Sequence, residues 1–493
     1  MKYNILFGGK AGQGANILTN LLGKILIKKG YCVFYSRDYQ SLIRGGHNFN
    51  VLSFSDKPIF SNDSKIDFLV SLDDETTKIH KKNLNKNGKI FSGNEQNIYY
   101  LGQLFKIFGI EFKLLEDELK ELDNFKENLK NAKKGYEGEK ERIKLKNLKN
   151  KINLFQNGIQ GISDGAIDSG LDIYYAYPMT PTTPLLNELA EKQKEKNIFV
   201  MELENEIAVI NAGLGSVMTG AKVMVGTSGG GFDLMTEGLS MAGMAEIPLV
   251  IILGQRPGPG TGVPTYNLQG DLNVAKHGGH GDFNKIILAP GDAVESQELT
   301  NQGFYFSQKY KIPAIIITDK HLAESYYSSI KKPLLKKIEK STKFGRYNSY
   351  EKDESGNSTE NVEIIIKNTN RRLKIKKELE KEAKKFKQYE VYGDKNSKNG
   401  IVFWGSTKGA ILDAIKDTKL FALQIKYIEP FPKEVEKFLK NKNLILVENN
   451  ATGQLGNLIK EKTGIEIKNK ILKYDARPFL ADELKEEIRR KCR

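Results

Sequence analysis

Three side chains and one glycine-rich segment could together bind a small carboxylate and act on a cofactor. Thr180 lies between two prolines in residues 177–184 (YPMTPTTP), which hold its backbone extended and restrict where its hydroxyl points. Arg256 opens a glycine- and proline-rich stretch, where a guanidinium is suited to bidentate recognition of a carboxylate. Glu206 precedes an apolar helical run, in which partial burial could raise its pKa enough for proton exchange near neutral pH. The glycines of residues 227–231 (TSGGG) would let the backbone approach a ligand.

Each of these features also has an ordinary structural explanation, which the residues alone leave open. The prolines could simply break the chain before a helix capped by Thr182 or Thr183. Arg256 could be a surface arginine. Acidic residues such as Glu202 and Glu204 are favoured at any helix N-terminus by the helix dipole.

A second glycine-rich segment, residues 8–14 (GGKAGQG), lies between an expected strand and an expected helix. Backbone N–H groups at such a turn favour an anion, and Arg44 in residues 40–46 (QSLIRGG) could assist a phosphate or interface role. The segment matches neither the P-loop nor the dinucleotide-binding pattern, so a tight turn that needs glycines is the alternative. His277 and His280 have no evident third ligand, and we expect no metal site in this chain.

Alternating strand and helix patterns predict an α/β chain of three domains. Residues 1–140 begin as strand, helix, strand, which predicts a parallel sheet, and end in an amphipathic helix over residues 94–135. After a linker at residues 141–156, residues 157–330 form a doubly wound domain whose candidate motifs directly follow strands. Its expected strands are residues 173–176, 199–201, 223–226, 249–253, 286–289 and 314–318.

The remaining third of the chain divides into two parts. Residues 331–399 are rich in charge and predict a linker or arm, with a β-stretch at residues 362–366. Residues 400–493 predict a third α/β domain, with strands starting at Ile401 and Leu444.

Composition excludes several function classes. The chain has 493 residues, no apolar stretch long enough to cross a bilayer, and no leader-like start, so we expect a cytoplasmic protein that does not bind membranes. Two cysteines are too few to bind an iron–sulfur cluster. The net charge of +15 comes from mixed-charge helical runs, and we expect no binding to nucleic acid.

In the order of its motifs, the chain resembles the α subunit of the 2-oxoacid:ferredoxin oxidoreductases, in the form that carries an N-terminally fused γ domain. The resemblance covers nearly the whole chain and identifies the three domains as γ, pyrimidine-binding and transketolase C-terminal-like. The matching segments are residues 9–14, 44–46, 177–182, 404–409, 430–432 and 452–454. The chain departs from the family pattern at Ala11, Met179, Thr182, Gly230 and Gly260.

The resemblance implies a role for each candidate residue. Thr180 and Arg256, with Tyr177, would bind the 2-oxoacid, and Glu206 would hydrogen-bond the aminopyrimidine of thiamine diphosphate as the catalytic residue. The further residues implied are Ser228, Gly229 and Gly230 for the cofactor, and Gly9, Gly12, Gln13, Gly14 and Arg44 for coenzyme A or an interface.

The resemblance also implies partners, because the chain contains no Gly-Asp-Gly element followed by Asn-Asn that could bind Mg²⁺ and a diphosphate. A β subunit would bring that site and a [4Fe–4S] cluster, and this chain would be inactive without it. The complex, expected to be (αβ)2, would convert a 2-oxoacid and coenzyme A to acyl-CoA and CO2 and reduce ferredoxin. A substrate of 2-oxoglutarate, or a broad range of 2-oxoacids, is slightly favoured.

Two other functions remain open at this point. One is a thiamine-dependent decarboxylase or transferase that passes on no electrons. The other is a non-enzymatic module that binds coenzyme A or a nucleotide.

Overall fold

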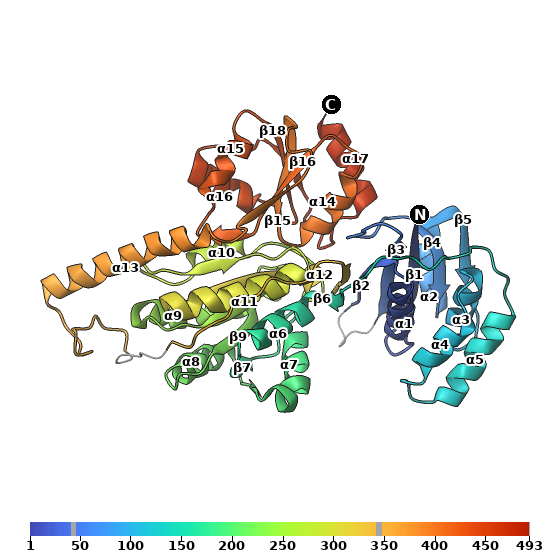
Figure 1. Cartoon of the computed structure of the whole chain (residues 1–493), viewed down its shortest axis with the longest axis horizontal. Coiled ribbons are helices and arrows are strands. Elements are labelled where there is room, and N and C mark those ends of the chain that lie inside the picture. The colour runs from blue at the N-terminus through green and yellow to red at the C-terminus, as the bar shows by residue number, and fades with distance from the viewer. Residues whose placement is uncertain (41–45, 342–347, 493) are drawn as a thin grey trace. The chain divides into compact units, whose positions relative to one another are not determined.

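The computed structural model describes residues 1–40, 46–341 and 348–492, which form two compact units. The first unit comprises Met1–Gln156, Ser325–Lys332 and Leu480–Leu484, and the second comprises Asn157–Glu324, Pro333–Phe479 and Lys485–Arg493. Figure 1 labels many of the helices and strands of both units. Among the described residues, no helix is both long and apolar enough to cross a membrane.

The first unit is built on a seven-stranded mixed sheet with the order β5-β4-β1-β3-β2-β13-β6. The expectation of a parallel sheet is wrong here, because β3 lies between β1 and β2 and pairs antiparallel with both. The connection from β2 to β3 is too short for the crossover that a parallel pair requires. The strands are β1 (Lys2–Lys10), β2 (Cys32–Asp38), β3 (His47–Ser55), β4 (Ile66–Ser71), β5 (Leu84–Phe91), β6 (Leu154–Asn157) and β13 (Tyr326–Ser329).

Five helices accompany this sheet: α1 (Ala15–Lys28), α2 (Asp74–His80), α3 (Asn97–Ile107), α4 (Phe112–Leu119) and α5 (Phe125–Glu137). The single helix expected over residues 94–135 is therefore three helices. Gly109 and Asn124, which adopt positive φ angles of 60° and 57°, lie where the helical path is interrupted. Beyond α5, residues 141–148 run back along the unit, where the Ile143 and Leu148 amides donate to the carbonyls of Ile107 and Lys29.

The second unit contains a seven-stranded sheet with the order β17-β11-β12-β10-β9-β7-β8. The pairs from β11 to β8 are parallel, and β17 adds an antiparallel edge. The strands are β7 (Ile173–Ala176), β8 (Phe199–Glu202), β9 (Val223–Ser228), β10 (Val250–Gln255), β11 (Ile286–Leu288), β12 (Ala314–Asp319) and β17 (Tyr427–Glu429). This arrangement confirms the predicted doubly wound domain.

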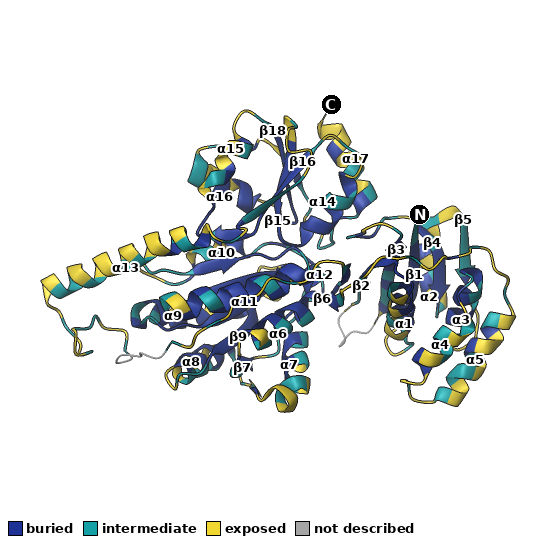
Figure 2. Ribbon diagram, in the orientation of Figure 1, coloured by how far each residue is buried: buried dark blue, intermediate teal, exposed yellow. Residues whose placement is uncertain are grey.

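Helices cover both faces of this sheet because its buried strands alternate their apolar side chains between two cores. Val225 and Leu253 face one core, with α8 (Glu206–Val217), α9 (Gly229–Ala245) and α10 (Leu272–His277). Met224 and Ile252 face the other core, with α6 (Gly158–Asp168), α7 (Thr183–Lys196) and α11 (Ala293–Tyr310). Figure 2 shows these central strands as buried. Sequence analysis did not identify α11, because many of its buried positions are occupied by polar side chains, which hide the apolar periodicity.

A third sheet has the order β14-β16-β15-β18-β19 and also belongs to the second unit. Its strands are β14 (Tyr389–Gly393), β15 (Asn399–Trp404), β16 (Phe421–Ile425), β18 (Asn443–Glu448) and β19 (Asn469–Leu472). The nearby helices are α14 (Lys408–Ala414), α15 (Glu436–Leu439) and α16 (Gln454–Thr463), and two further helices are α12 (Lys320–Glu324) and α17 (Ala481–Lys491). The two strands expected in the last domain are therefore present as β15 and β18.

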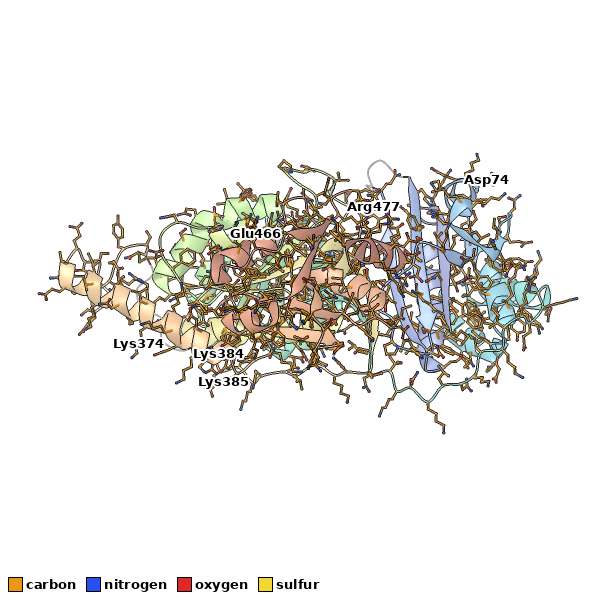
Figure 3. The ribbon with its side chains drawn as sticks, turned by 90° about the horizontal axis from the view of Figure 1, so that it is seen from above. Asp74, Lys374, Lys384, Lys385, Glu466 and Arg477 are labelled. Carbon is orange, nitrogen blue, oxygen red and sulfur yellow. The ribbon has the colours of Figure 1, made fainter. Side chains whose placement is uncertain are left out.

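The segment expected to contain a β-stretch at residues 362–366 is instead the start of α13 (Val362–Ala383), a helix of 22 residues. Asn361 caps it by accepting from the amides of Glu363 and Ile364, and the strong helix formers that follow outweigh the β-branched start. The helix is mostly exposed (Figure 2). Lys374, on this helix, and Lys384 and Lys385, which follow it, project outward (Figure 3).

Candidate active site

The candidate residues of the second unit lie at one edge of its sheet. Strands β8, β7, β9 and β10 are consecutive neighbours and run parallel, so their carboxyl ends share one edge. Thr180 follows β7, Glu206 follows β8, Ser228 ends β9 and Arg256 follows β10. The topology therefore brings together residues that are up to 76 positions apart in the sequence.

Arg256 and Thr180 contact each other directly. The Arg256 Nη1 atom donates to the Thr180 carbonyl oxygen at 3.2 Å, so the arginine holds the loop through its backbone. The loop packs closely on β10, since a Cβ atom on Gly254 would lie 2.7 Å from Thr182 Cγ2. Among the described residues, no other hydrogen bond is made by the Thr180 hydroxyl or the Arg256 guanidinium, so both have donors for a ligand.

Arg256 is half-buried and interacts electrostatically with two carboxylates. Burial lowers the pKa of its guanidinium, and the nearby Asp271 and Glu206 carboxylates act in the opposite direction. A partly desolvated guanidinium binds an incoming carboxylate more strongly than an exposed one. The geometry is therefore compatible with carboxylate recognition.

Glu206 is buried and aimed at the start of α9. It is the first residue of α8, which Asn205 caps by accepting from the Ala208 amide at 2.9 Å. Its side chain is 3% exposed, and its Oε1 atom has no hydrogen-bond partner among the described residues. A Cβ atom on Gly231 would lie 2.3 Å from this oxygen, so only glycine fits at that position.

The three residues predicted to contact the cofactor lie where β9 ends and α9 begins, with Ser228 as the last residue of β9 and Gly229 and Gly230 in the first turn of α9. Ser228 is fully buried, and its Oγ atom also lacks a partner in the described part of the chain. A Cβ atom on Gly229 would lie 2.7 Å from Asp271 Oδ2, whereas one on Gly230 would meet nothing within 4 Å. Gly230 therefore faces open space at this helix N-terminus.

Sequence analysis missed Asp271, and it placed Gly231 in the glycine-rich segment without giving it a role of its own. Asp271 precedes α10, and its amide donates to Gln255 Oε1 at 2.9 Å, which holds it beside the end of β10. Burial, and then Asp233, raises the pKa of its carboxyl to about 6, while Arg256 acts to lower it. Its only signal in the sequence is an acidic residue directly before an apolar helical run.

Three buried polar atoms thus approach the first turn of α9 without partners among the described residues: Glu206 Oε1, Ser228 Oγ and Asp271 Oδ2. An unpaired buried polar atom costs about 1–3 kcal/mol, so such a group indicates a ligand that supplies the missing hydrogen bonds. The Glu206 carboxylate and the Ser228 hydroxyl lie beside Gly230, which faces open space. This arrangement suits a ring that carries amino and imino nitrogen atoms.

Tyr177 directly follows β7 and is 38% exposed. No hydrogen bond joins it to Thr180, Glu206 or Arg256 in the parts of the chain that the structure describes. Its role at the site stays a prediction.

The glycine-rich segment of the first unit forms a tight turn. The Gln13 side chain accepts from the Lys10 amide at 2.7 Å, and Asn97 donates to the Gln13 carbonyl oxygen at 3.1 Å. Gly9 and Gly14 have no room for a Cβ atom, because Gln13 and Asn97 lie against them, whereas Gly12 faces open space with a φ of +87°. These contacts account for two of the glycines without a ligand, and the proposed role for coenzyme A stays a prediction. Arg44 lies outside the described residues.

His277 ends α10, and His280 lies in the loop that follows. No group of three or more His, Cys, Asp or Glu side chains suited to a metal ion is found in the described ranges.

Comparisons with known proteins agree with this arrangement. The family model "Pyruvate flavodoxin/ferredoxin oxidoreductase, thiamine diP-bdg" matches residues 164–395, and "Pyruvate ferredoxin/flavodoxin oxidoreductase" matches residues 4–98. The chain is 30% identical to a 2-oxoacid:ferredoxin oxidoreductase subunit alpha of Saccharolobus solfataricus, over 99% of this chain and 98% of the relative. It is 31% identical to the 2-oxoglutarate synthase subunit KorA of Methanocaldococcus jannaschii, over 61% of this chain and 89% of the relative.

A solved structure shares the fold over the full length of both chains. It is the 2-oxoglutarate:ferredoxin oxidoreductase from Magnetococcus marinus with 2-oxoglutarate, coenzyme A and succinyl-CoA bound, with a TM-score of 0.87 and 23% identity. The sequence matches, together with the arrangement of charged residues at the edge of the sheet, show that this chain belongs to the 2-oxoacid:ferredoxin oxidoreductase family.

Proposed function

We propose that this chain is the γ-fused α subunit of a two-subunit enzyme that oxidatively decarboxylates a 2-oxoacid to acyl-CoA and CO2 and passes the electrons to ferredoxin. The observation that supports the proposal best is the convergence of Thr180, Arg256 and Glu206 at one edge of the sheet. This set provides a binding group for a carboxylate next to a buried acid.

Arg256 is the proposed binding group for the substrate carboxylate, and Thr180 the group that supports it. Arg256 donates one N–H to the Thr180 carbonyl oxygen. This hydrogen bond orients the guanidinium and leaves its other N–H groups for a bidentate contact with a carboxylate. The Thr180 hydroxyl, next to this contact, could donate to a substrate oxygen. Tyr177 could border the same pocket.

The residues present fit the pyrimidine ring of thiamine diphosphate. Glu206 would hold a proton at a ring nitrogen, and Ser228 and the backbone of Gly229 and Gly230 would contact the ring, which would satisfy the two unpartnered oxygens of Glu206 and Ser228. When bound, this cofactor supplies the carbanion that attacks the 2-oxo carbon. Because Glu206 is buried, the proton that it would share with the ring nitrogen is shielded from water.

A separate β subunit is proposed to provide two further parts of the enzyme. These are the site that binds Mg²⁺ and the cofactor diphosphate, and a [4Fe–4S] cluster. The only cysteines of the chain are Cys32, which is buried, and Cys492, which is exposed. Two thiolates cannot bind a cluster that takes four. The naming of the relatives as subunit alpha supports a β partner. We also propose an (αβ)2 assembly, as the resemblance to the family implies.

We assign residues 1–140 to a γ domain, 157–330 to a pyrimidine-binding domain and 400–493 to a transketolase C-terminal-like domain. Residues 141–156 and 331–399 connect them. The name of the family model that matches residues 164–395 supports the thiamine-binding assignment. Coenzyme A is proposed as co-substrate, with the turn at Gly12 as a candidate contact.

Among substrates, 2-oxoglutarate or a broad range of 2-oxoacids is favoured. Relatives named 2-oxoglutarate synthase support this preference. A panel of pyruvate, 2-oxoglutarate, branched-chain 2-oxoacids and aryl pyruvates would test it directly.

The test is to co-express the chain with a β subunit and to measure reduction of ferredoxin or a viologen dye that depends on 2-oxoacid, coenzyme A and thiamine diphosphate. We expect activity only with both chains, and a fall of about 10²–10⁴-fold in kcat in Glu206→Ala. Glu204→Ala is the matched control, because Glu204 is an exposed carboxylate two residues away and should retain wild-type activity.

Two outcomes would contradict the proposal. Decarboxylation without reduction of the dye would indicate a thiamine-dependent decarboxylase or transferase. A folded complex loaded with cofactor but without any turnover would indicate a binding module.

A further inference from the structure

Gln454 joins the third sheet of the second unit to the doubly wound sheet. It is the first residue of α16 and is buried. Its Nε2 atom donates to the Gly270 carbonyl oxygen at 2.8 Å, and its Oε1 atom accepts from the Asn273 amide at 3.1 Å. One side chain therefore bridges both ends of the turn at residues 270–273, where α10 begins. The function proposed above gives no role to this glutamine or to its motif at residues 452–454.

Buried amide groups hold the same turn at other points. The Asp271 amide donates to Gln255 Oε1 at 2.9 Å, and Gln255 Nε2 donates to the Thr318 carbonyl oxygen at 3.3 Å. Directly before the turn, the Gln269 amide donates to the Asn449 carbonyl oxygen at 2.7 Å, and the Asn449 amide donates to Gln269 Oε1 at 3.0 Å. The position of the turn therefore depends on the third sheet as well as on the doubly wound sheet.

The turn places the Asp271 carboxylate at the first turn of α9. A Cβ atom on Gly229 would lie 2.7 Å from Asp271 Oδ2, so this oxygen lies close to the Gly229 backbone. Asp271 Oδ2 is buried and accepts no hydrogen bond from the described residues, and Glu206 Oε1 and Ser228 Oγ are in the same condition. A buried oxygen without a partner indicates a ligand that donates the missing hydrogen bond.

We infer that Asp271 accepts a hydrogen bond from an N–H group of the bound cofactor ring, and that Gln454 positions Asp271 by holding the turn at residues 270–273. This inference rests on the proposed function and extends the cofactor site to a residue of the third sheet's helix α16. Gln454 is a positioning residue, because its hydrogen bonds are made to the backbone of the turn.

The carboxylate depends on the turn for its position. Because Asp271 Oδ2 has no partner among the described residues, the backbone and the packing against Gly229 determine where it lies. Without Gln454, the Gly270 carbonyl and the Asn273 amide lose their partners, and the turn must shift to satisfy them. A hydrogen bond weakens steeply when its distance or angle leaves the ordinary range, so a small shift of the turn weakens the contact with the ring.

The experiment uses the co-expressed enzyme with its β subunit, freed of cofactor and titrated by calorimetry with thiamine diphosphate in the presence of Mg²⁺. Gln454→Met keeps the length of the side chain and removes both hydrogen bonds to the turn. We expect the dissociation constant for thiamine diphosphate to rise about tenfold, as the loss of one hydrogen bond to a charged group predicts. The kcat at saturating cofactor should stay near the wild-type value, because a group that only supports binding changes affinity and not turnover.

Gln424→Met is the matched control. Gln424 is also a buried glutamine that joins the same two sheets, but its Nε2 atom donates to Glu295 of α11, at 2.7 Å, and not to the turn. This variant should lower the melting temperature and leave the affinity for thiamine diphosphate unchanged. The comparison separates displacement of the turn from a general loss of contact between the sheets.

A double-mutant cycle tests whether Gln454 acts through Asp271. Asp271→Ala removes the proposed acceptor and should by itself weaken the binding of thiamine diphosphate about tenfold. When Gln454→Met is added to Asp271→Ala, the affinity should change by less than about twofold, because the carboxylate that Gln454 positions is already absent.

Gln454→Glu is a second variant in case Gln454→Met folds poorly. A glutamate is favoured at the first position of α16, keeps the acceptor for the Asn273 amide and loses the donor to the Gly270 carbonyl oxygen. It should also weaken the binding of thiamine diphosphate. Wild-type affinity in both Gln454 variants, or an equal loss of affinity with and without Asp271, would overturn the inference alone. A wild-type complex that binds no thiamine diphosphate would contradict the proposed function as well.

Discussion

At the scale of single residues, the site depends on where side chains are absent as much as on where they are present. Gly229 and Gly231 lie in the same helical turn, and each has a carboxylate oxygen against it, from Asp271 and Glu206 respectively. A side chain at either position would displace the acid. The glycines of α9 therefore allow two carboxylates to reach the N-terminus of a helix.

Gly231→Ala should inactivate the enzyme without preventing its folding. The new Cβ atom would lie 2.1 Å from Thr227 Oγ1 and 2.3 Å from Glu206 Oε1, so the Glu206 carboxylate must move. When a catalytic carboxylate loses its orientation, kcat falls by about 10²-fold. The measurement is steady-state dye reduction by the αβ complex, with thermal unfolding as a check of the fold.

Gly215→Ala provides the comparison for that substitution. Gly215 is exposed within α8, and a Cβ atom there would meet nothing within 4 Å. Alanine at such a position stabilises a helix by about 0.5–1 kcal/mol, so activity should be unchanged and the melting temperature slightly higher. Equal losses of activity in both variants would show that the effect of Gly231→Ala is not a specific displacement of Glu206.

At the scale of elements, helix α8 determines where Glu206 points. The helix begins at Glu206, and the Asn205 side chain satisfies the Ala208 amide at 2.9 Å. The cap therefore fixes the position at which the first helical residue, and its carboxylate, leaves the backbone.

Asn205→Ala should lower the free energy of unfolding by about 1 kcal/mol, because the Ala208 amide loses its acceptor. We expect a fall in kcat as well, since the start of α8 becomes less well defined. Asn205→Asp restores an acceptor and should recover most of the stability, which denaturant titration of both variants can measure. A fall in stability of the same size in Asn205→Asp would show that the cap does not account for the loss.

At the scale of the whole molecule, a buried ion network joins the doubly wound sheet of the second unit to the third sheet. Lys408, at the start of α14, binds Asp292 and Glu295, which flank the start of α11. Glu295 also accepts from Gln424 and from the Gly291 amide, each at 2.7 Å. The lysine and the glutamate are both almost fully buried. The segment at residues 404–409, identified in the sequence only as a family motif, therefore joins two layers of the unit.

Lys408→Met should lower the free energy of unfolding by about 3–5 kcal/mol, because the buried Glu295 and the partly buried Asp292 lose their nearest cation and Glu295 keeps only Lys426, at 3.9 Å. Lys374→Met is the control: Lys374 is 77% exposed, and its ion pair with Glu378 should contribute less than about 1 kcal/mol. Urea unfolding at pH 7 compares the two variants. A loss below about 1 kcal/mol in Lys408→Met would contradict the structural role of the network.

The same network predicts how stability depends on pH. Burial disfavours the Glu295 carboxylate, but Lys408 and Lys426 outweigh burial and lower its pKa to about 2. Because the folded pKa is depressed, this group contributes stability above the ordinary value of 4.5 and loses it as the pH falls from 4.5 towards 2. The difference in stability between wild type and Lys408→Met should therefore shrink below pH 4.5. A difference that stays constant down to the lowest pH at which both proteins fold would be inconsistent with this coupling.

Much of the fold and part of the site could be predicted from local patterns. Runs such as residues 249–253 and 314–318 are apolar enough to identify buried parallel strands, and Thr180, Glu206 and Arg256 each come shortly after the end of an expected strand. The helix at residues 362–383 and the antiparallel pairing of β3 were not predicted. In the first case a capping residue and a long stretch of helix formers overrode a β-branched start, and in the second the pairing depends on a partner elsewhere in the chain.

By itself, the sequence determined the alternation of strands and helices, the positions of the chemical groups after strands, and the family, because these are recorded in short stretches of neighbouring residues. Only the tertiary structure decided that Arg256 holds the Thr180 backbone, that Glu206 and Asp271 lie against glycines of one helical turn, and that Lys408 joins two sheets. These contacts link residues far apart in the sequence. Their energies depend on burial and on which carboxylates face which cations, and both arise only when strands from different parts of the chain are placed side by side.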